Sequence, residues 1–155
     1  MPSQEPSEKV VGTNRKAQHD YFIDEVFETG IVLTGTEIKS VRAGRVSLRD
    51  AYAKVVDGEM WLYNSHVSPY DQGNRYNHEP RRPRKLLLHR KEIARLWDSV
   101  RQKGVTIIPL NVYLKEGRAK VEIALAKGKK LYDKRDDMAR RDAQREIERQ
   151  LRGRD

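Results

Sequence analysis

The 155-residue sequence contains no cysteine, which excludes a disulfide framework, a zinc site built on thiolates and a cysteine nucleophile. It also lacks an uninterrupted apolar run of about 20 residues, the length a helix needs to cross a bilayer. Residues 1–8 are polar and include Glu5 and Glu8, unlike the apolar centre of a secretory signal. These absences predict a soluble, cytoplasmic protein without a membrane partner.

Charge of one sign is in excess. The chain has 32 Lys and Arg residues against 23 Asp and Glu, which gives a net charge of +9. A surplus of this size favours a polyanionic partner, either nucleic acid or an anionic membrane surface. Hydrophobic residues make up only 37% of the chain and charged residues 35%, which indicates one compact core flanked by charged segments.

Two turn signals predict hairpins. Asp57-Gly58 separates apolar runs at 51–56 and 59–63, and Lys115-Glu116-Gly117 separates runs at 105–114 and 118–126. Ahead of them, a strand is expected at 21–27, a turn at Glu28-Thr29-Gly30 and a second strand at 31–34.

Two helices are expected between the strands. Residues 35–44 form a short one, and an amphipathic helix opens at His89, with Ile93, Leu96, Trp97 and Val100 at helical spacing. The pattern gives about six strands with two inserted helices, in a chain too short for a doubly wound sheet. The sequence therefore predicts a mainly β fold, a small antiparallel OB-like barrel that leaves few exposed edges. Four aromatic side chains lie in apolar patterns and are expected in the core: Phe22, Phe27, Trp61 and Trp97.

The ends of the chain differ in composition from this barrel. Residues 1–12 predict a flexible arm, residues 13–132 the barrel, and residues 133–155 a basic tail. From Lys127 to the end there are 11 basic and 7 acidic residues, and the apolar stripe is thin, with alanine at two of its four positions. Such a stripe cannot hold a helix firmly to a core. The tail is expected to be disordered alone and helical with a partner.

The densest positive charge lies in residues 75–91, where seven Lys and Arg side chains accompany only Glu79. Arginine donates two parallel hydrogen bonds to phosphate, and Tyr70 and Tyr76 beside this run can stack on unpaired bases. A second basic cluster occupies residues 127–130. A solvated basic loop is the structural alternative, but the chain-wide excess of charge favours RNA contact.

Catalysis is not expected. The four histidines, at 19, 66, 78 and 89, fall at no metal-ligand spacing, and the sequence has neither a nucleophile elbow nor a phosphate-binding Walker loop. We therefore predict no metal, no cofactor and no enzymatic activity, with a nuclease as a weaker alternative. Nothing in the pattern forces a dimer, and a monomer is expected.

Several blocks of the chain resemble the SsrA-binding proteins (small protein B) of bacterial ribosome rescue. They occur in the family's order and extend over most of the chain: Asn14–Phe22, Gly35–Arg42, Arg84–His89 with Glu92 and Ile93, Lys120–Lys130, and Asp133–Arg135. The resemblance implies an OB-like barrel that binds the tRNA-like domain of transfer-messenger RNA. The pair would enter stalled ribosomes for trans-translation, with the tail helical in the empty mRNA channel and the nascent chain tagged for degradation.

The resemblance also implies roles for individual residues. Leu87, His89 and Lys120 would contact the transfer-messenger RNA, and Asn14, His19 and Glu28 would lie near its elbow and the decoding site. The last three are also open to a structural interpretation, as residues that cap or fix the first strand. The matching blocks add further basic RNA contacts, namely Lys39, Arg42, Arg84, Lys85, Lys127, Lys129 and Lys130. Engagement of the ribosome would fall to Asp133, Lys134, Arg135, Ile147 and Leu151. A general OB-type RNA chaperone or rRNA-binding factor is the alternative function.

Overall fold

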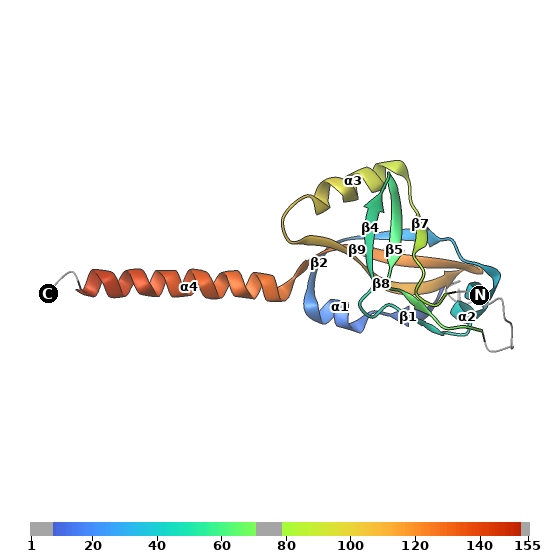
Figure 1. Cartoon of the computed structure of the whole chain (residues 1–155), viewed down its shortest axis with the longest axis horizontal. Coiled ribbons are helices and arrows are strands. Elements are labelled where there is room, and N and C mark those ends of the chain that lie inside the picture. Colours follow the sequence, from blue (N-terminus) through green and yellow to red (C-terminus); the bar gives the residue numbers. More distant parts are fainter. Residues whose placement is uncertain (1–7, 71–78, 153–155) are drawn as a thin grey trace, which may run out of the picture.

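The computed structural model of the chain describes residues 8–70 and 79–152, and within the last helix it describes the side chains of Lys129 and of residues 141–151. The main sheet and a small second sheet, β3 with β6, are antiparallel (Figure 1). The strands are β1 (Glu8–Thr13), β2 (Tyr21–Ile31), β3 (Val46–Ser47), β4 (Tyr52–Val56), β5 (Glu59–Tyr63), β6 (His66–Val67), β7 (Arg84–Leu87), β8 (Val105–Lys115) and β9 (Arg118–Gly128). The helices are α1 (Arg15–Asp20), α2 (Gly35–Arg42), α3 (Arg90–Val100) and α4 (Lys129–Arg152).

The main sheet closes on itself. In the described part of the chain its strand order is β1-β8-β4-β5-β7-β2-β9, and β8 also pairs with β9. Six strands therefore form a ring, and β1 is attached to β8 outside it. The ring is irregular, because β4 meets β8 through one register pair, Ala53 with Ile107, and β2 meets β7 through two. The predicted mainly β, OB-like sheet of about six strands is confirmed, as a ring rather than a regular barrel.

The two predicted hairpins are present. Asp57 and Gly58 have φ angles of 51° and 76°, and Glu116 and Gly117 have 51° and 78°. Both pairs occupy the left-handed region that a two-residue turn between twisted strands requires. The second turn has two residues rather than the predicted three, since Lys115 pairs with Arg118 at the end of β8.

The first part of the chain differs from the prediction in three ways. No turn occurs at 28–30, because all three residues pair with β9 and extend β2 to Ile31. Residues 8–13, expected largely within the loose arm, form β1 on the edge of β8. Residues 15–20 form the short helix α1. Six residues are too few for helical periodicity to be recognised in the sequence.

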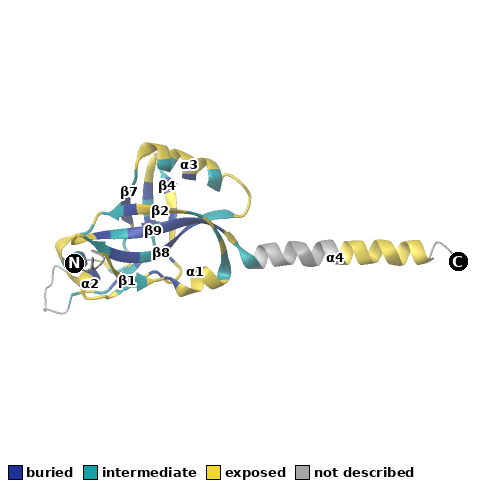
Figure 2. Ribbon diagram, turned by 180° about the vertical axis from the view of Figure 1, so that it is seen from behind, coloured by how far each residue is buried: buried dark blue, intermediate teal, exposed yellow. Residues whose placement is uncertain are grey.

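Apolar side chains form two clusters on opposite faces of the β8–β9 hairpin. The larger fills the ring and includes Ile107, Val121 and Leu125. The smaller lies on the other face, where Ile108 and Ala124 pack with Ala17 of α1. Figure 2 shows the dark, buried stretches of β8 and β9 that separate these clusters. Alternation along the strands therefore produces a two-sided core at the α1 end of the hairpin.

The predicted aromatic core is only partly correct. Phe27 is buried and Trp61 is half-buried, but Phe22 and Trp97 are exposed. In α3 the inward position belongs to Leu96, which is fully buried, while the Trp97 side chain next to it is 47% exposed. Helical spacing identified the apolar stripe, but it could not identify which edge of that stripe lies over the ring.

The chain leaves the ring through α4, which projects away from the sheet (Figure 1). This helix begins at Lys129, four residues before the predicted start of the tail, and it follows β9 directly. Its described residues 141–151 are all exposed (Figure 2). The predicted helical form of the tail is present. Its disorder in the absence of a partner remains a prediction.

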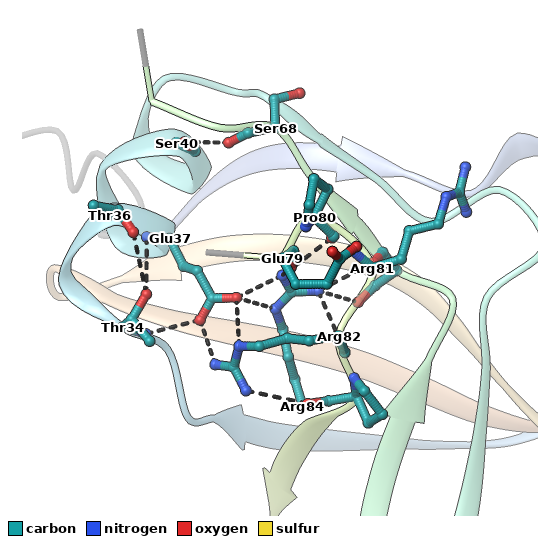
Figure 3. Close-up of polar contacts among 12 residues, drawn as sticks. Thr34, Thr36, Glu37, Ser40, Ser68, Glu79, Pro80, Arg81, Arg82 and Arg84 are labelled. Atoms are coloured by element: carbon teal, nitrogen blue, oxygen red, sulfur yellow. Dashed lines mark hydrogen bonds and ion pairs between the residues drawn. The ribbon is translucent and has the colours of Figure 1, made fainter. Parts of the chain in front are cut away.

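A buried carboxylate ties α2 to the strand β7. Glu37, fully buried, completes a capping box with Thr34, whose backbone N–H donates to Oε1 at 2.8 Å. Arg82 Nε donates to Oε2 at 2.9 Å, Arg82 Nη2 donates to Oε1, and Arg84 Nε donates to Oε2 at 2.5 Å (Figure 3). Arg84 also donates to the backbone and hydroxyl oxygens of Ser65 and to the Pro80 carbonyl.

These contacts keep the group ionised inside the protein. Burial alone would raise the pKa of the Glu37 carboxyl, but the hydrogen bonds from Arg82, Thr34 and Arg84 outweigh burial and lower it. Burial lowers the pKa of Arg84, an effect that Glu37 opposes. The cluster therefore fixes the approach of residues 79–84 to α2, and with it the start of β7.

Replacing Glu37 by alanine leaves the guanidinium of Arg84 buried without its counter-charge. We expect the free energy of unfolding to fall by about 3–5 kcal/mol, the usual result of breaking a buried ion pair, as measured by urea denaturation. Glu59→Ala is the matched control, because its 3.1 Å pair with Lys85 is exposed and should contribute less than about 1 kcal/mol. Equal losses in the two variants would contradict this account of the cluster.

Candidate nucleic-acid interface

Strand register brings residues from four strands into one row. Leu87 of β7 pairs with Gly30 of β2, Gly30 pairs with Lys120 of β9, and Lys120 pairs with Tyr113 of β8. Directly paired residues of antiparallel strands project from the same face of the sheet. The Leu87 side chain is 51% exposed, so this is an outer face of the ring.

Glu28 belongs to the same face, since it lies two residues from Gly30 along β2. Tyr113 donates its hydroxyl hydrogen to Glu28 Oε2 at 2.5 Å, and Lys115 Nζ lies 3.4 Å from each carboxylate oxygen. We call the outward surface made by Glu28, Leu87, Tyr113, Lys115 and Lys120 the acceptor face. It joins a carboxylate, an apolar side chain and two ammonium groups that come from four strands.

The polar groups on this face shift one another's pKa values. The hydrogen bond from Tyr113 is the main reason that the pKa of Glu28 is lowered, and Lys115 and Lys120 lower it further against a smaller effect of burial. The same contact acts on the donors: burial and then the bond to Glu28 raise the pKa of Tyr113, and the bond to Glu28 raises the pKa of Lys115. Glu28 is therefore a charged acceptor at neutral pH.

Gly30 provides the space between Leu87 and Lys120. A Cβ at this position would lie 3.3 Å from the Leu87 Cβ, closer than ordinary van der Waals contact. The missing side chain lets the Leu87 side chain lie against β2, since its Cδ1 and Cγ would be 3.5 and 3.8 Å from such a Cβ. Gly30 is therefore explained by the close approach of Leu87, and not by the turn that the sequence suggested.

A second group of predicted residues lies at the root of α4. Lys129 Nζ is 5.3 Å from the centre of the Phe22 ring and donates to the Gln18 carbonyl at 3.3 Å. His19, the next residue of α1, is exposed and its Nδ1 lies 3.0 Å from Asp20 Oδ1. Lys127 is exposed and pairs with Phe22. These contacts gather basic groups where the tail leaves the ring.

The other basic residues that were predicted to contact RNA are dispersed over the described part of the structure. Lys39 lies over the Tyr70 ring at 5.6 Å, and Arg42 donates to the Gly117 carbonyl at 3.3 Å. Lys85 forms its ion pair with Glu59 on the outside of β7. His89 is exposed at the start of α3, where its backbone N–H donates to Glu92 Oε1 at 3.2 Å. Lys85 projects from the same side of the sheet as Leu87, two residues before it along β7, but none of the four is among the residues that define the acceptor face.

Two predicted RNA contacts are corrected. Arg84 is fully buried in the Glu37 cluster, so its guanidinium is not available to RNA in this structure. Asn14 is also buried; its side chain accepts from the Ala17 N–H at 3.2 Å and donates to the Pro109 carbonyl at 2.9 Å. This is the structural reading that the sequence left open, a cap that fixes α1 against β8.

Some predicted residues lie outside the described side chains. Lys130, Asp133, Lys134 and Arg135 fall within the span of α4, but their side chains are not described, and Arg75, Tyr76 and His78 lie outside the described residues altogether. Ile147 and Leu151 are described and exposed. Their spacing of four residues places them on one side of the helix.

Sequence reasoning missed Tyr113 and Lys115. Both alternate with apolar residues in β8, which is a signal for an outward position, but only the register of β8, β9 and β2 identifies Glu28 as their neighbour. Among the described residues, no group of three or more His, Asp or Glu side chains is placed to hold a metal ion. Within the same residues, no helix is long and apolar enough to cross a membrane.

Comparison with known proteins gives consistent matches. The SmpB protein family model matches residues 11–153. The chain is 65% identical over 146 residues to the SsrA-binding protein of Desulforudis audaxviator, covering 94% of this chain and 95% of the relative. It is 61% identical over 147 residues to the SsrA-binding protein of Carboxydothermus hydrogenoformans, covering 95% of this chain and 99% of the relative.

A solved structure is also similar. It is described as "tmRNA-SmpB: a journey to the center of the bacterial ribosome" and shares 50% sequence identity with this chain at a TM-score of 0.65. The similarity covers 75% of this chain and 82% of the solved chain. It supports the sheet described above.

The contact between Tyr113 and Glu28 should be visible when the tyrosines are titrated at alkaline pH. Because burial and the bond to Glu28 raise the pKa of Tyr113, its phenol should stay protonated at the pH of about 10 at which a tyrosine free in solution ionises. Tyr113→Phe should leave the absorbance change near that pH unaltered and remove only a component at higher pH. The stabilisation from the Tyr113–Glu28 hydrogen bond should accordingly be complete from neutral pH to about pH 10, decline above it as the phenol ionises, and decline in acid as the Glu28 carboxylate is protonated. Loss of amplitude in the ordinary range would contradict the assignment.

Proposed function

The chain belongs to the SmpB protein family, and from this premise we propose that it binds transfer-messenger RNA and delivers it to stalled ribosomes. In this role it is a non-catalytic adaptor of trans-translation that works in the cytoplasm, as a monomer and without a cofactor. The names of its relatives, SsrA-binding proteins, support the RNA partner. The similar tmRNA-SmpB structure supports the ribosome as the place of action.

One observation carries the RNA-binding part of this proposal. Glu28, Leu87 and Lys120, which are 92 residues apart at most along the chain, converge on one outer face through the pairing of β7, β2 and β9. Their chemistries are complementary to a folded RNA: an acceptor for base or ribose donors, an apolar surface for a base, and a cation for phosphate. On this basis the acceptor face binds the tRNA-like domain.

Basic residues outside this face contribute attraction. Lys39, Lys85, His89, Lys127 and Lys129 contact the RNA or its ribosomal surroundings, and salt weakens this contribution. His19 acts as a donor at the root of the tail, and Asn14 supports it as the cap that holds α1 against β8. Arg84 acts only as a support for β7.

The tail serves the ribosome rather than the initial RNA complex. Its exposed Ile147 and Leu151 give α4 a narrow apolar stripe without a partner among the described residues, and the segment from Lys127 has 11 basic against 7 acidic residues. Such a helix suits the phosphate-lined mRNA channel of a ribosome. Asp133, Lys134 and Arg135 engage the ribosome at the base of this helix. The chain thus divides into an arm, a barrel and a tail, with residues 8–12 assigned to the barrel through β1 and the tail helix beginning at Lys129 rather than at residue 133.

Competition binding tests the proposal. Purified protein is bound to labelled transfer-messenger RNA at physiological salt, and unlabelled RNA is added in excess. We expect the transfer-messenger RNA to compete and an unrelated structured RNA of equal length to compete poorly, because the acceptor face reads particular donors as well as phosphates. Equal competition by both RNAs would instead support a general RNA chaperone or rRNA-binding factor, and loss of RNA on incubation would indicate a nuclease.

A truncation after Arg135 tests the role of the tail separately from RNA binding. It removes most of α4 and leaves the acceptor face intact, so the affinity for transfer-messenger RNA should be unchanged while tagging of nascent chains is abolished. Normal tagging by the truncated protein would contradict the role assigned to the tail.

A further inference from the structure

The contact between Tyr113 and Glu28 spans a whole strand. The two residues belong to β8 and β2, and β9 lies between these strands. Neighbouring strands are separated by about 4.8 Å, so neither residue lies beside the other in the sheet. The Tyr113 ring must extend over β9, near Lys120, for its hydroxyl to come within 2.5 Å of the Glu28 carboxylate.

The two partners differ in burial. The Tyr113 residue is only 7% exposed, so its ring is held by the surrounding strands. The Glu28 side chain is 42% exposed, and an unrestrained exposed glutamate samples several rotamers, whose loss on binding opposes complex formation. The hydrogen bond from the buried Tyr113 to one carboxylate oxygen restricts the rotamers of Glu28 in the free protein, before RNA binds.

The geometry leaves the other oxygen available. Glu28 Oε2 receives the Tyr113 hydrogen bond, whereas Oε1 receives, from the described residues, only the longer 3.4 Å contact of Lys115. A carboxylate oxygen accepts up to two hydrogen bonds. Oε1 therefore retains capacity for an N–H or O–H donor from a base edge or a ribose.

Charge alone does not explain how this face would select RNA. Two other acids lie close by: Glu8 is 3.7 Å from Lys115, and Glu122 pairs with Glu28 across β2 and β9 and accepts from Asn111 at 3.2 Å. Three carboxylates therefore accompany Lys115 and Lys120. A surface with this balance attracts phosphate weakly, and its selectivity has to come from acceptors placed for particular donors.

We propose that Tyr113 is a positioning residue of the RNA interface, whose hydroxyl, supported by Lys115, fixes the Glu28 carboxylate across β9 so that Oε1 accepts a donor from the RNA. This inference rests on the proposed function. It adds the requirement that Tyr113 acts on RNA affinity through Glu28 and does not itself touch the RNA.

A double-mutant cycle tests this requirement. The dissociation constant for transfer-messenger RNA is measured for the full-length chain, Tyr113→Phe, Glu28→Ala and the double variant. Tyr113→Phe keeps the ring and should weaken binding by roughly two- to tenfold, the size expected when one freed side chain has to be ordered on binding. In the Glu28→Ala background the same change should have little further effect. Tyr63→Phe, which removes a hydroxyl from the outside of β5, is the matched control and should leave affinity unchanged.

The outcomes separate the inference from the function on which it rests. Selective binding by the original chain together with unaltered affinity of Tyr113→Phe overturns the inference alone. So does a Tyr113→Phe effect that persists undiminished without Glu28, since the tyrosine would then act by another route. Failure of the original chain to prefer transfer-messenger RNA overturns both. Circular dichroism and thermal unfolding of each variant show whether it has folded, and a loss of folding in Tyr113→Phe would assign the hydroxyl a structural role and contradict the proposal.

Discussion

The pairing of β8 with β9 is the constraint on which the rest of the structure depends. Its two-residue turn fixes which residues face each other from Lys115 with Arg118 to Asn111 with Glu122, and a bulge between Pro109 and Asn111 shifts the register of the rest. The outer edges of the same hairpin pair with β4 and β2 and so close the ring. A slip of one residue would turn Lys120 into the core and Val121 outward. The core and the acceptor face are thus two consequences of one register.

The structure consists of a ring of paired strands and a C-terminal helix, α4, that extends away from it. The ring holds its surface residues on paired strands, and the Glu37 cluster anchors the segment that leads into β7 and Leu87. The tail helix has no such support along residues 141–151, all of which are exposed. Most helical stability in proteins comes from tertiary packing, so this helix depends on a partner in a way that the ring does not. That difference suits a two-step role in which RNA binding precedes engagement of the ribosome.

Local signals in the sequence predicted local structure well and distant contacts poorly. Asp57-Gly58 and the turn before Arg118 identified both hairpins, because turn geometry is encoded in adjacent residues. Gly30 was interpreted as a turn, since its reason for being glycine, the approach of Leu87, lies 57 residues away. Arg84 was assigned to RNA because composition does not reveal a buried partner, and Glu37 lies 47 residues earlier. Tyr113 escaped notice for the same reason.

Site-specific photo-crosslinking tests the central claim, that the outer face of β7, β2, β9 and β8 binds the RNA. A photoreactive amino acid is placed at Leu87 or, as a control, at Tyr52, which is also exposed but lies on β4 in another part of the ring. The account predicts strong crosslinks to the tRNA-like domain of transfer-messenger RNA from position 87 and weak ones from position 52. Crosslinks from position 52 alone, or equally from both, would contradict it.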